Sequence, residues 1–307
     1  IIANRYEKNS LKNMISVSDG EIDAAFGYTH NLARWEPASI LFGAPIAGAG
    51  IGIDSITFKS WFYNGGGSKL YDKLWNQLRL NVKGFILQSS VPHSLGWFKE
   101  PINSLHDLKD TRFRRNDDIS SEILRKMGVS ILPMREADII PELEKSKLDG
   151  VSLCCPKADL ELGLQRVIKN YYLQGISTNI LNTDLYLNKN IFDSLTKQQK
   201  KAIEIAARAS QSKYRSRMIY ENGKAVRDLI EGHNVFLHDT PEEIIFTYLN
   251  MAQQLFEKNA ILDPFFAEVW QSQKDFASVV VPYWDDTQVI DELLRKEYIK
   301  ENIDYIE

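Results

Sequence analysis

Residues 107–150 read DLKDTRFRRNDDISSEILRKMGVSILPMREADIIPELEKSKLDG, and this stretch alternates short apolar segments with helical patterns. Helical spacing covers 120–127, which ends at Gly128, and 136–147. Three short strands are expected, at 111–115, 129–132 and 148–153. Alternating β and α elements predict a mostly parallel sheet covered by helices.

The first of these strands carries an arginine at its end. Side chains alternate along a strand, so Phe113 is expected to face one way and Arg112 and Arg114 the other. Arg114 is a candidate functional residue, and the alternative is that it forms a salt bridge at the surface or between lobes. Arg112 and Arg115 are expected to be solvated.

The second half of the chain is predicted to be mainly helical. A long strand is expected at 175–187, and Thr196 is a suitable N-cap for a long scaffold helix that reaches about Glu231. A strand at 234–237 precedes Thr240-Pro241, which has the signature of a helix start. Further helices are expected to about residue 259, from 263 to a stop at Pro282, and over 288–302.

Several short pieces along nearly the whole chain together resemble one family. They are Pro37-Ala38, the run 61–67 with Leu70, Gly96-Trp97-Phe98, Asp107-Leu108-Lys109 with Phe113-Arg114, Pro156, 162–164, Tyr171-Tyr172, 187–189 and 220–222. In order and spacing they are similar to the solute-binding subunits of tripartite ATP-independent periplasmic (TRAP) transporters. The similarity is greatest to the branch that binds keto acids and other small carboxylates.

The resemblance implies an α/β, two-lobe periplasmic solute-binding protein fold with a hinge and a long scaffold helix. Lobe one is expected at 1–91 plus 180–222, and lobe two at 92–179 plus 223–307 with the C-terminal helices. The ligand cleft would lie between the lobes. An opening strand and helix normally precede the segment that resembles 17–26, so the first lobe is expected to be incomplete at its N-terminus.

The resemblance also implies the ligand contacts. The arginine at Arg114 pairs with the substrate carboxylate in this family, a role that suits a guanidinium fork. At the positions of the family's other ligand and cation contacts, this chain has different residues. We therefore expect a roomier pocket. The further ligand-binding candidates are His93, Ser152, Leu153, Ile176, Thr178 and Asn31.

Two of these positions carry most of the chemistry. Ser152 stands where the family has a carboxylate, which removes the negative charge that a hard cation needs and puts a bound cation in doubt. His93 could contact the ligand as an imidazolium, since a neighbouring carboxylate raises the pKa of histidine. The alternative is a neutral histidine satisfied by backbone groups at the turn beside Pro92.

Composition excludes several classes of protein. A chain of 307 residues with 44% hydrophobic residues is long enough for two lobes, and a net charge of −4 predicts neither a nucleic-acid partner nor a polybasic membrane anchor. No stretch reaches the roughly 18 apolar residues of a membrane span. A periplasmic location is expected from the family. No secretory signal is visible at Ile1, because Arg5, Glu7 and Lys8 interrupt any apolar region.

The only cysteines, Cys154 and Cys155, are adjacent. One trans peptide spaces Cα atoms more closely than disulfides prefer, so two thiols are expected, with a strained vicinal disulfide as the alternative. No C-x-x-C pair or clustered histidine accompanies them, so neither a metal site nor another cofactor is expected. Gly65-Gly66-Gly67 lacks the Lys-Ser or Lys-Thr of a phosphate-binding loop.

No catalytic motif is present, and we expect no enzyme. The predicted function is an extracytoplasmic receptor that captures a small organic carboxylate, such as a 2-keto acid, and delivers it to the ion-coupled TRAP membrane permease. One alternative is a diverged sensory or scaffold protein with the same fold, and a remote one is a thiol enzyme. A homodimer through the C-terminal helix is also considered.

Overall fold

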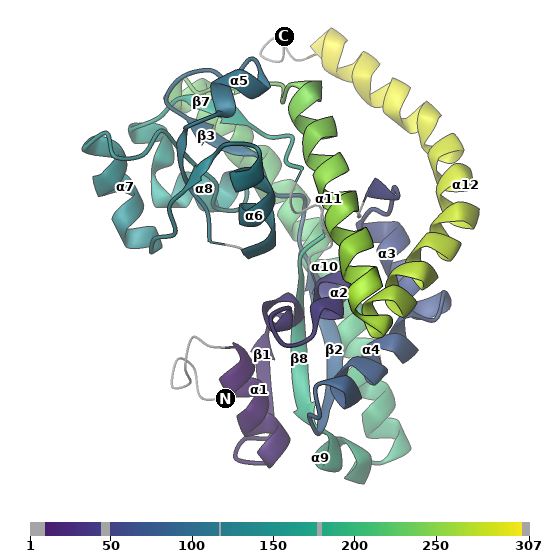
Figure 1. Ribbon diagram of the computed structural model, residues 1–307. Coiled ribbons are helices and arrows are strands. Elements are labelled where there is room, and N and C mark those ends of the chain that lie inside the picture. The colour runs from purple at the N-terminus through teal and green to yellow at the C-terminus, as the bar shows by residue number, and fades with distance from the viewer. Residues whose placement is uncertain (1–9, 44–49, 117, 177–179, 303–307) are drawn as a thin grey trace. The chain divides into compact units, whose positions relative to one another are not determined.

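The computed structural model describes residues 10–43, 50–116, 118–176 and 180–302 of the 307-residue chain (Figure 1). The chain divides into two compact units. Unit 1 comprises the described parts of Ile1–Val91, Ile180–Met218 and Phe256–Phe276, and unit 2 comprises those of Pro92–Asn179, Ile219–Leu255 and Ala277–Glu307. The first lobe is expected to be incomplete ahead of residue 17. Helix α1 (Ser10–Asp19) overlaps that segment, and residues 1–9 lie outside the described part.

Residues 256–276 belong to unit 1, whereas the predicted division placed them in the second lobe. Hydrogen bonds explain the difference. Trp61 donates its indole N–H to Ser272 Oγ at 3.1 Å, and Gln273 Nε2 donates to the carbonyl of Leu41 at 2.9 Å. Contacts between residues so far apart in the chain cannot be predicted from local sequence patterns.

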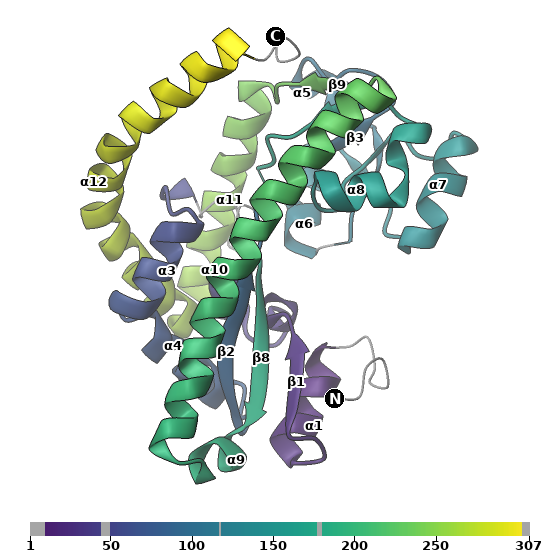
Figure 2. The same cartoon turned by 180° about the vertical axis from the view of Figure 1, so that it is seen from behind.

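Unit 1 contains a three-stranded antiparallel sheet in the order β1 (Ala24–Gly27), β8 (Asn182–Asn188) and β2 (Val82–Ser89). Helix α10 (Lys197–Arg227) crosses one face (Figure 2), where Leu185 and Leu187 join its cluster with Ala207. The opposite face carries Tyr186, whose ring meets that of Trp75 at 5.3 Å. The strand that was expected at 175–187 begins at Asn182 and ends at Asn188.

Short helices complete unit 1. Asp54 caps α3 (Ser55–Asn64) by accepting the backbone N–H groups of Ile56 and Thr57, a capping box that fixes where this helix begins. The other elements are α1 (Ser10–Asp19), η1 (Thr29–Leu32), η2 (Pro37–Ser39), α2 (Ile40–Gly43), α4 (Gly67–Gln77) and α9 (Lys189–Ser194).

Unit 2 contains a six-stranded sheet in the order β5-β4-β6-β3-β7-β9. The prediction of a mostly parallel sheet is only partly right, because β3 runs antiparallel to both of its neighbours. A Cβ atom at Gly96, the first residue of β3, would lie 2.6 Å from the carbonyl oxygen of Val151, so only glycine fits there. The strands are β3 (Gly96–Phe98), β4 (Arg112–Arg114), β5 (Ser130–Ile131), β6 (Gly150–Val151), β7 (Asn170–Tyr172) and β9 (Phe236–His238).

The helices of unit 2 bury an apolar core against this sheet. Trp97 of β3 and Tyr171 of β7 stack with ring centroids 4.1 Å apart, and Leu143 and Leu229 belong to the same cluster. The helical elements are α5 (Leu105–Leu108), α6 (Asp118–Lys126), α7 (Glu136–Glu144), α8 (Pro156–Leu162), η4 (Leu164–Arg166), η5 (Asp228–Gly232) and α11 (Glu242–Leu262), whose end from Phe256 onward belongs to unit 1.

Two long helices test the predicted boundaries. Thr196 caps α10 as expected, through its Oγ1 at 3.2 Å from the backbone nitrogen of Gln199. The predicted stop at Pro282 is wrong, because α12 (Pro264–Asn302) continues through it. Proline removes one backbone hydrogen bond, and the turns on either side keep theirs. No helix in the described part of the chain is long and apolar enough to cross a membrane.

Candidate functional site

Arg114 ends strand β4 and is buried, with only 4% of its surface exposed. Its Nη1 donates to the carbonyl of Ser152 at 2.9 Å, and its Nε and Nη2 donate to the carbonyl of Met134 at 3.3 and 3.2 Å. Burial lowers the pKa of this guanidinium, and the nearby Arg115 lowers it further, while Glu136 acts in the opposite direction. The buried cation is therefore held mainly by neutral carbonyl groups.

The two arginines beside Arg114 have opposite environments. Arg112 is exposed, as predicted, and forms a bidentate pair with Asp149 in which Nε and Nη2 lie 2.8 and 2.5 Å from the carboxylate oxygens. Arg115 was expected to be solvated, and this is wrong, because only 6% of it is exposed. Its Nη1 lies 3.1 Å from Ser152 Oγ. Strand pairing in the sheet, not the local sequence, brings Ser152 beside it.

Ser152 thus joins two buried guanidinium groups, one through its carbonyl and one through its hydroxyl. The pairing of Arg114 with Val151 in the β4–β6 ladder places Ser152 at this point. The sequence predicted both Arg114 and Ser152 as candidates, and the structure brings them into contact.

His93 and Cys154 also come together, although 61 residues separate them. His93 Nε2 lies 3.7 Å from Cys154 Sγ, and the two cysteine sulfurs lie 3.0 Å apart with both thiols free. The pKa of the Cys154 thiol is raised, first by its hydrogen bond to Cys155 and then by burial. Both effects favour the thiol over the thiolate at Cys154.

Ile176 also belongs to unit 2 and follows a glycine that packs against His93. It is buried, and the preceding Gly175 packs so tightly that a Cβ atom would lie 1.7 Å from the carbonyl oxygen of His93. Leu153 is partly buried and packs against the core around Trp97. Thr178 lies outside the residues that the structure describes.

Sequence reasoning missed the buried carboxylate of Asp159 on helix α8. Its Oδ2 accepts the indole N–H of Trp97 and the hydroxyl of Tyr171, both at 2.9 Å, and its Oδ1 lies 3.4 Å from the backbone nitrogen of Cys154. Burial raises the pKa of Asp159 to about 6. The carboxylate thereby links the backbone of Cys154 to Trp97 and Tyr171. No local sequence pattern predicts this link, because it depends on how α8 packs against the sheet.

Asn31 belongs to unit 1, where it lies exposed on η1. The element that carries it is anchored by Thr29, whose Oγ1 donates to the buried Asp184 at 2.7 Å. Tyr186 donates to the same carboxylate oxygen at 3.2 Å, and burial raises the pKa of Asp184 to about 6.

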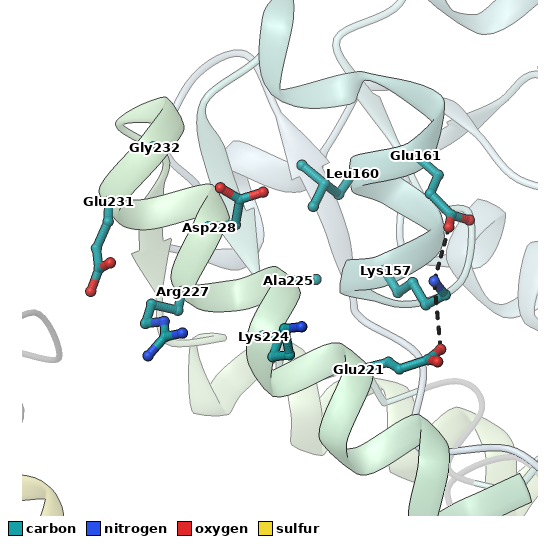
Figure 3. A pocket seen from close by; sticks show the side chains of 10 residues that line it. All are labelled: Lys157, Leu160, Glu161, Glu221, Lys224, Ala225, Arg227, Asp228, Glu231 and Gly232. Atoms are coloured by element: carbon teal, nitrogen blue, oxygen red, sulfur yellow. Dashed lines mark hydrogen bonds and ion pairs between the residues drawn. The ribbon is translucent and has the colours of Figure 1, made fainter.

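A pocket of about 680 Å³ lies between α8 and the end of α10 with η5, away from the predicted residues (Figure 3). Lys157 lies 2.9 Å from Glu161 and 3.5 Å from Glu221, so charges of both signs neutralise each other along it. Ligand sites are mostly apolar with a few polar groups, which this lining is not. Its lining residues are Lys157, Leu160, Glu161, Glu221, Lys224, Ala225, Arg227, Asp228, Glu231 and Gly232.

The part of the chain that the structure describes brings no three His, Cys, Asp or Glu side chains together in a way that could hold a metal ion.

Comparison with known proteins bears on the family and the fold of this chain. Residues 9–260 match the DctP family, described as bacterial extracellular solute-binding protein, family 7. A monocarboxylate 2-oxoacid-binding periplasmic protein of Nostoc sp. (strain PCC 7120) is 26% identical over 217 residues, which are 71% of this chain. The chain spans only 58% of the length of that relative.

Solved structures of TRAP transporter solute-binding proteins share the fold. One from Bordetella bronchiseptica RB50, with copurified calcium and picolinate, has a TM-score of 0.84 at 21% identity, covering 95% of this chain and 85% of that one. One from Pseudoalteromonas atlantica T6c, with bound sodium and pyruvate, has a TM-score of 0.79 at 22% identity, covering 94% and 85%. The chain belongs to the DctP family of bacterial extracellular solute-binding proteins, the TRAP solute-binding proteins.

Proposed function

We propose that this protein is the periplasmic receptor of a TRAP transporter and binds a small monocarboxylate, a 2-oxoacid in the first instance, through Arg114. The observation that carries the proposal is the buried guanidinium of Arg114 at the end of β4. In the described part of the chain, its hydrogen-bond partners are two backbone carbonyls. A guanidinium has five N–H donors, so each terminal nitrogen keeps one for a ligand. Carboxylate is the group that suits such a fork.

The remaining contacts follow from the neighbours of Arg114. His93 and Ser152 are assigned as polar contacts on unit 2, and Leu153 and Ile176 as apolar contacts for the ligand's tail. Thr178 and Asn31 stay predictions from the family position alone. The 2-oxoacid is favoured because the Nostoc relative is named for 2-oxoacids and two structural neighbours hold pyruvate.

We further propose that binding needs no cation. Structural neighbours from Pseudoalteromonas atlantica and Colwellia psychrerythraea hold sodium and calcium beside pyruvate. In this chain Ser152 stands at the predicted cation position, and its hydroxyl lies 3.1 Å from Arg115 Nη1. A second guanidinium beside the ligand provides the positive charge that a metal ion would otherwise supply.

The loaded receptor would deliver its carboxylate to the TRAP membrane permease. We also propose a homodimer formed through the C-terminal half of α12. That half exposes a row of apolar side chains, and the Bordetella bronchiseptica neighbour is a dimer. The exposed residues are Val289, Ile290, Leu293, Leu294 and Tyr298.

Thermal unfolding against a panel of 2-oxo, hydroxy, amino and simple carboxylates, with and without chelator, tests the proposed function. A ligand at about 100 times its Kd stabilises by roughly 2.7 kcal/mol, which raises Tm by a few degrees. Stabilisation by pyruvate that survives the chelator supports a cation-independent receptor. Stabilisation that requires added calcium or sodium overturns that part, and no response to any acid, in protein shown by mass spectrometry to carry no ligand, overturns the whole.

A further inference from the structure

The two cysteines are the third and fourth residues after Val151, the last residue of strand β6, and already touch. Their sulfurs are 3.0 Å apart, and both thiols are free. Cys154 is half-buried, whereas only 1% of Cys155 is exposed. A reagent from solvent therefore reaches Cys154 first, with Cys155 waiting behind it.

The backbone of Cys154 is fixed on both sides. Its carbonyl accepts the N–H of Ser94 at 3.1 Å, and its own N–H points at the buried carboxylate of Asp159 at 3.4 Å. Cys155, in extended conformation, precedes the first residue of α8. The two sulfurs consequently stay close because the chain around them is held, not because a crosslink joins them.

We propose that Cys154 and Cys155 form a redox modification site that takes a disulfide-bearing oxidant and closes reversibly to a vicinal disulfide. In the first step Cys154 loses its proton to solvent and attacks a disulfide RSSR, releasing RS⁻. In the second step Cys155 loses its proton to solvent, attacks Cys154 Sγ and expels the second RS⁻. The two RS⁻ take up two protons, so two protein thiols are oxidised and one RSSR is reduced to two RSH.

The local chemistry suits the second of these steps. Cys154 donates its S–H to Cys155, and this hydrogen bond is the main cause that lowers the pKa of Cys155. A lowered pKa favours Cys155 as the thiolate that resolves the mixed disulfide. The Cα atoms of neighbouring residues are about 3.8 Å apart across a trans peptide, below the usual disulfide range of roughly 4.4–6.8 Å. The ring is therefore strained and easily reduced, as regulatory disulfides are.

Closure of the ring would reach the carboxylate site, a consequence that rests on the proposed function. His93 lies 3.7 Å from the sulfur that would change partner. Ser152, which accepts from Arg114, is two residues upstream of Cys154. A change of partner at the Cys154 sulfur disturbs the surroundings of both residues, so oxidation weakens carboxylate binding.

Mass spectrometry of the full chain tests the site itself. The protein is incubated with oxidised glutathione, quenched in acid, unfolded and alkylated. Supporting results are the loss of both alkylations without a bound glutathione, and their return after mild reduction. Cys155→Ser should stop at one glutathione on Cys154, and Cys154→Ser should react far more slowly. Persistent alkylation of both cysteines, or two stable glutathione adducts in the wild-type protein, overturns the proposal.

Calorimetric titration with pyruvate tests the coupling. Oxidised protein is expected to bind about 5-fold or more weakly than reduced protein, within the usual range of coupling between sites. The double variant Cys154→Ala, Cys155→Ala should show the same Kd under both conditions. Equal affinity of the oxidised and reduced wild-type protein overturns the coupling. Absence of binding in both states contradicts the proposed function instead, while the glutathione result decides the redox site independently.

Discussion

The guanidinium of Arg114 and the carbonyl of Ser152 lie 2.9 Å apart, Nη1 to oxygen, although 38 residues separate them in the chain. Parallel pairing of β4 with β6 creates this contact, because the ladder sets Arg114 beside Val151. The end of β4 and the residue after β6 therefore form one site, and Arg115 joins it through the Ser152 hydroxyl.

Replacing Arg114 is expected to abolish most carboxylate binding. Loss of a buried charge partner costs about 2–5 kcal/mol, so Arg114→Ala should raise the Kd for pyruvate by roughly 30-fold or more in calorimetric titration. Arg114→Lys keeps the charge but loses the fork, and should fall between Arg114→Ala and the wild type.

Arg112→Ala is the matched control, because Arg112 lies on the same strand but is exposed and paired with Asp149. Its Kd should match that of the wild type. The ligand role of Arg114 is refuted if Arg114→Ala, folded by circular dichroism, binds pyruvate as tightly as Arg112→Ala does.

Asp159 is expected to make the protein less stable as pH rises. Burial raises its pKa to about 6 from an ordinary 3.8, so the folded state holds a proton that the unfolded chain releases. The contribution of this group to stability is complete below about pH 4 and is lost as pH rises through 6. Asp159→Asn should remove on the order of 3 kcal/mol of this pH dependence in urea unfolding between pH 4 and 7.

Asp149→Asn provides the opposite sign. Arg112 lowers the pKa of Asp149, so this group stabilises the fold above its unfolded pKa and loses that effect as pH falls. Asp149→Asn should therefore lower the free energy of unfolding, measured in urea, at neutral pH and change it little in acid. An Asp159→Asn variant with the wild-type pH profile would show that its carboxyl is not the titrating group.

Gly175 is expected to tolerate no side chain. A Cβ atom there would lie 1.7 Å from the carbonyl oxygen of His93, so Gly175→Ala must move the backbone of one of the two segments. Overpacking of this kind costs about 1–3 kcal/mol, measurable as a lower urea midpoint. Pyruvate binding should weaken as well, because His93 shifts.

Gly223→Ala is the contrasting change. Gly223 lies within α10, and a Cβ atom there meets nothing within 4 Å. Alanine should stabilise the helix by roughly 0.5–1 kcal/mol and leave pyruvate binding unchanged. Similar midpoints for the two variants would mean that His93 and Gly175 are not in close contact.

The C-terminal half of α12 is expected to mediate self-association. A chain that ends at Pro282 lacks the exposed apolar row that includes Leu293 and Leu294. Sedimentation should give a dimer for the full chain and a monomer for the shortened one. Leu293→Lys with Leu294→Lys in the full chain should act like the truncation. Equal mass for the full and shortened chains would speak against a dimer formed by this helix.

Much of the local structure could be predicted from the sequence. Thr196 as an N-cap predicted where α10 begins, and glycine with helical spacing predicted the end of α6 near Gly128. These signals work because caps and periodicity are short-range. The same reasoning failed at Pro282, where helical turns on both sides outweigh one lost hydrogen bond.

By itself, the sequence determined the class of fold, the placement of Arg114 at a strand end and the family to which the chain belongs. Only the tertiary structure decided that Arg115 is buried, that His93 meets Cys154 and that Asp159 accepts hydrogen bonds from Trp97 and Tyr171. Periodicity records which face of an element is apolar, whereas strand order decides which distant residues share an edge. Burial and pKa follow from that order, and no local pattern contains it.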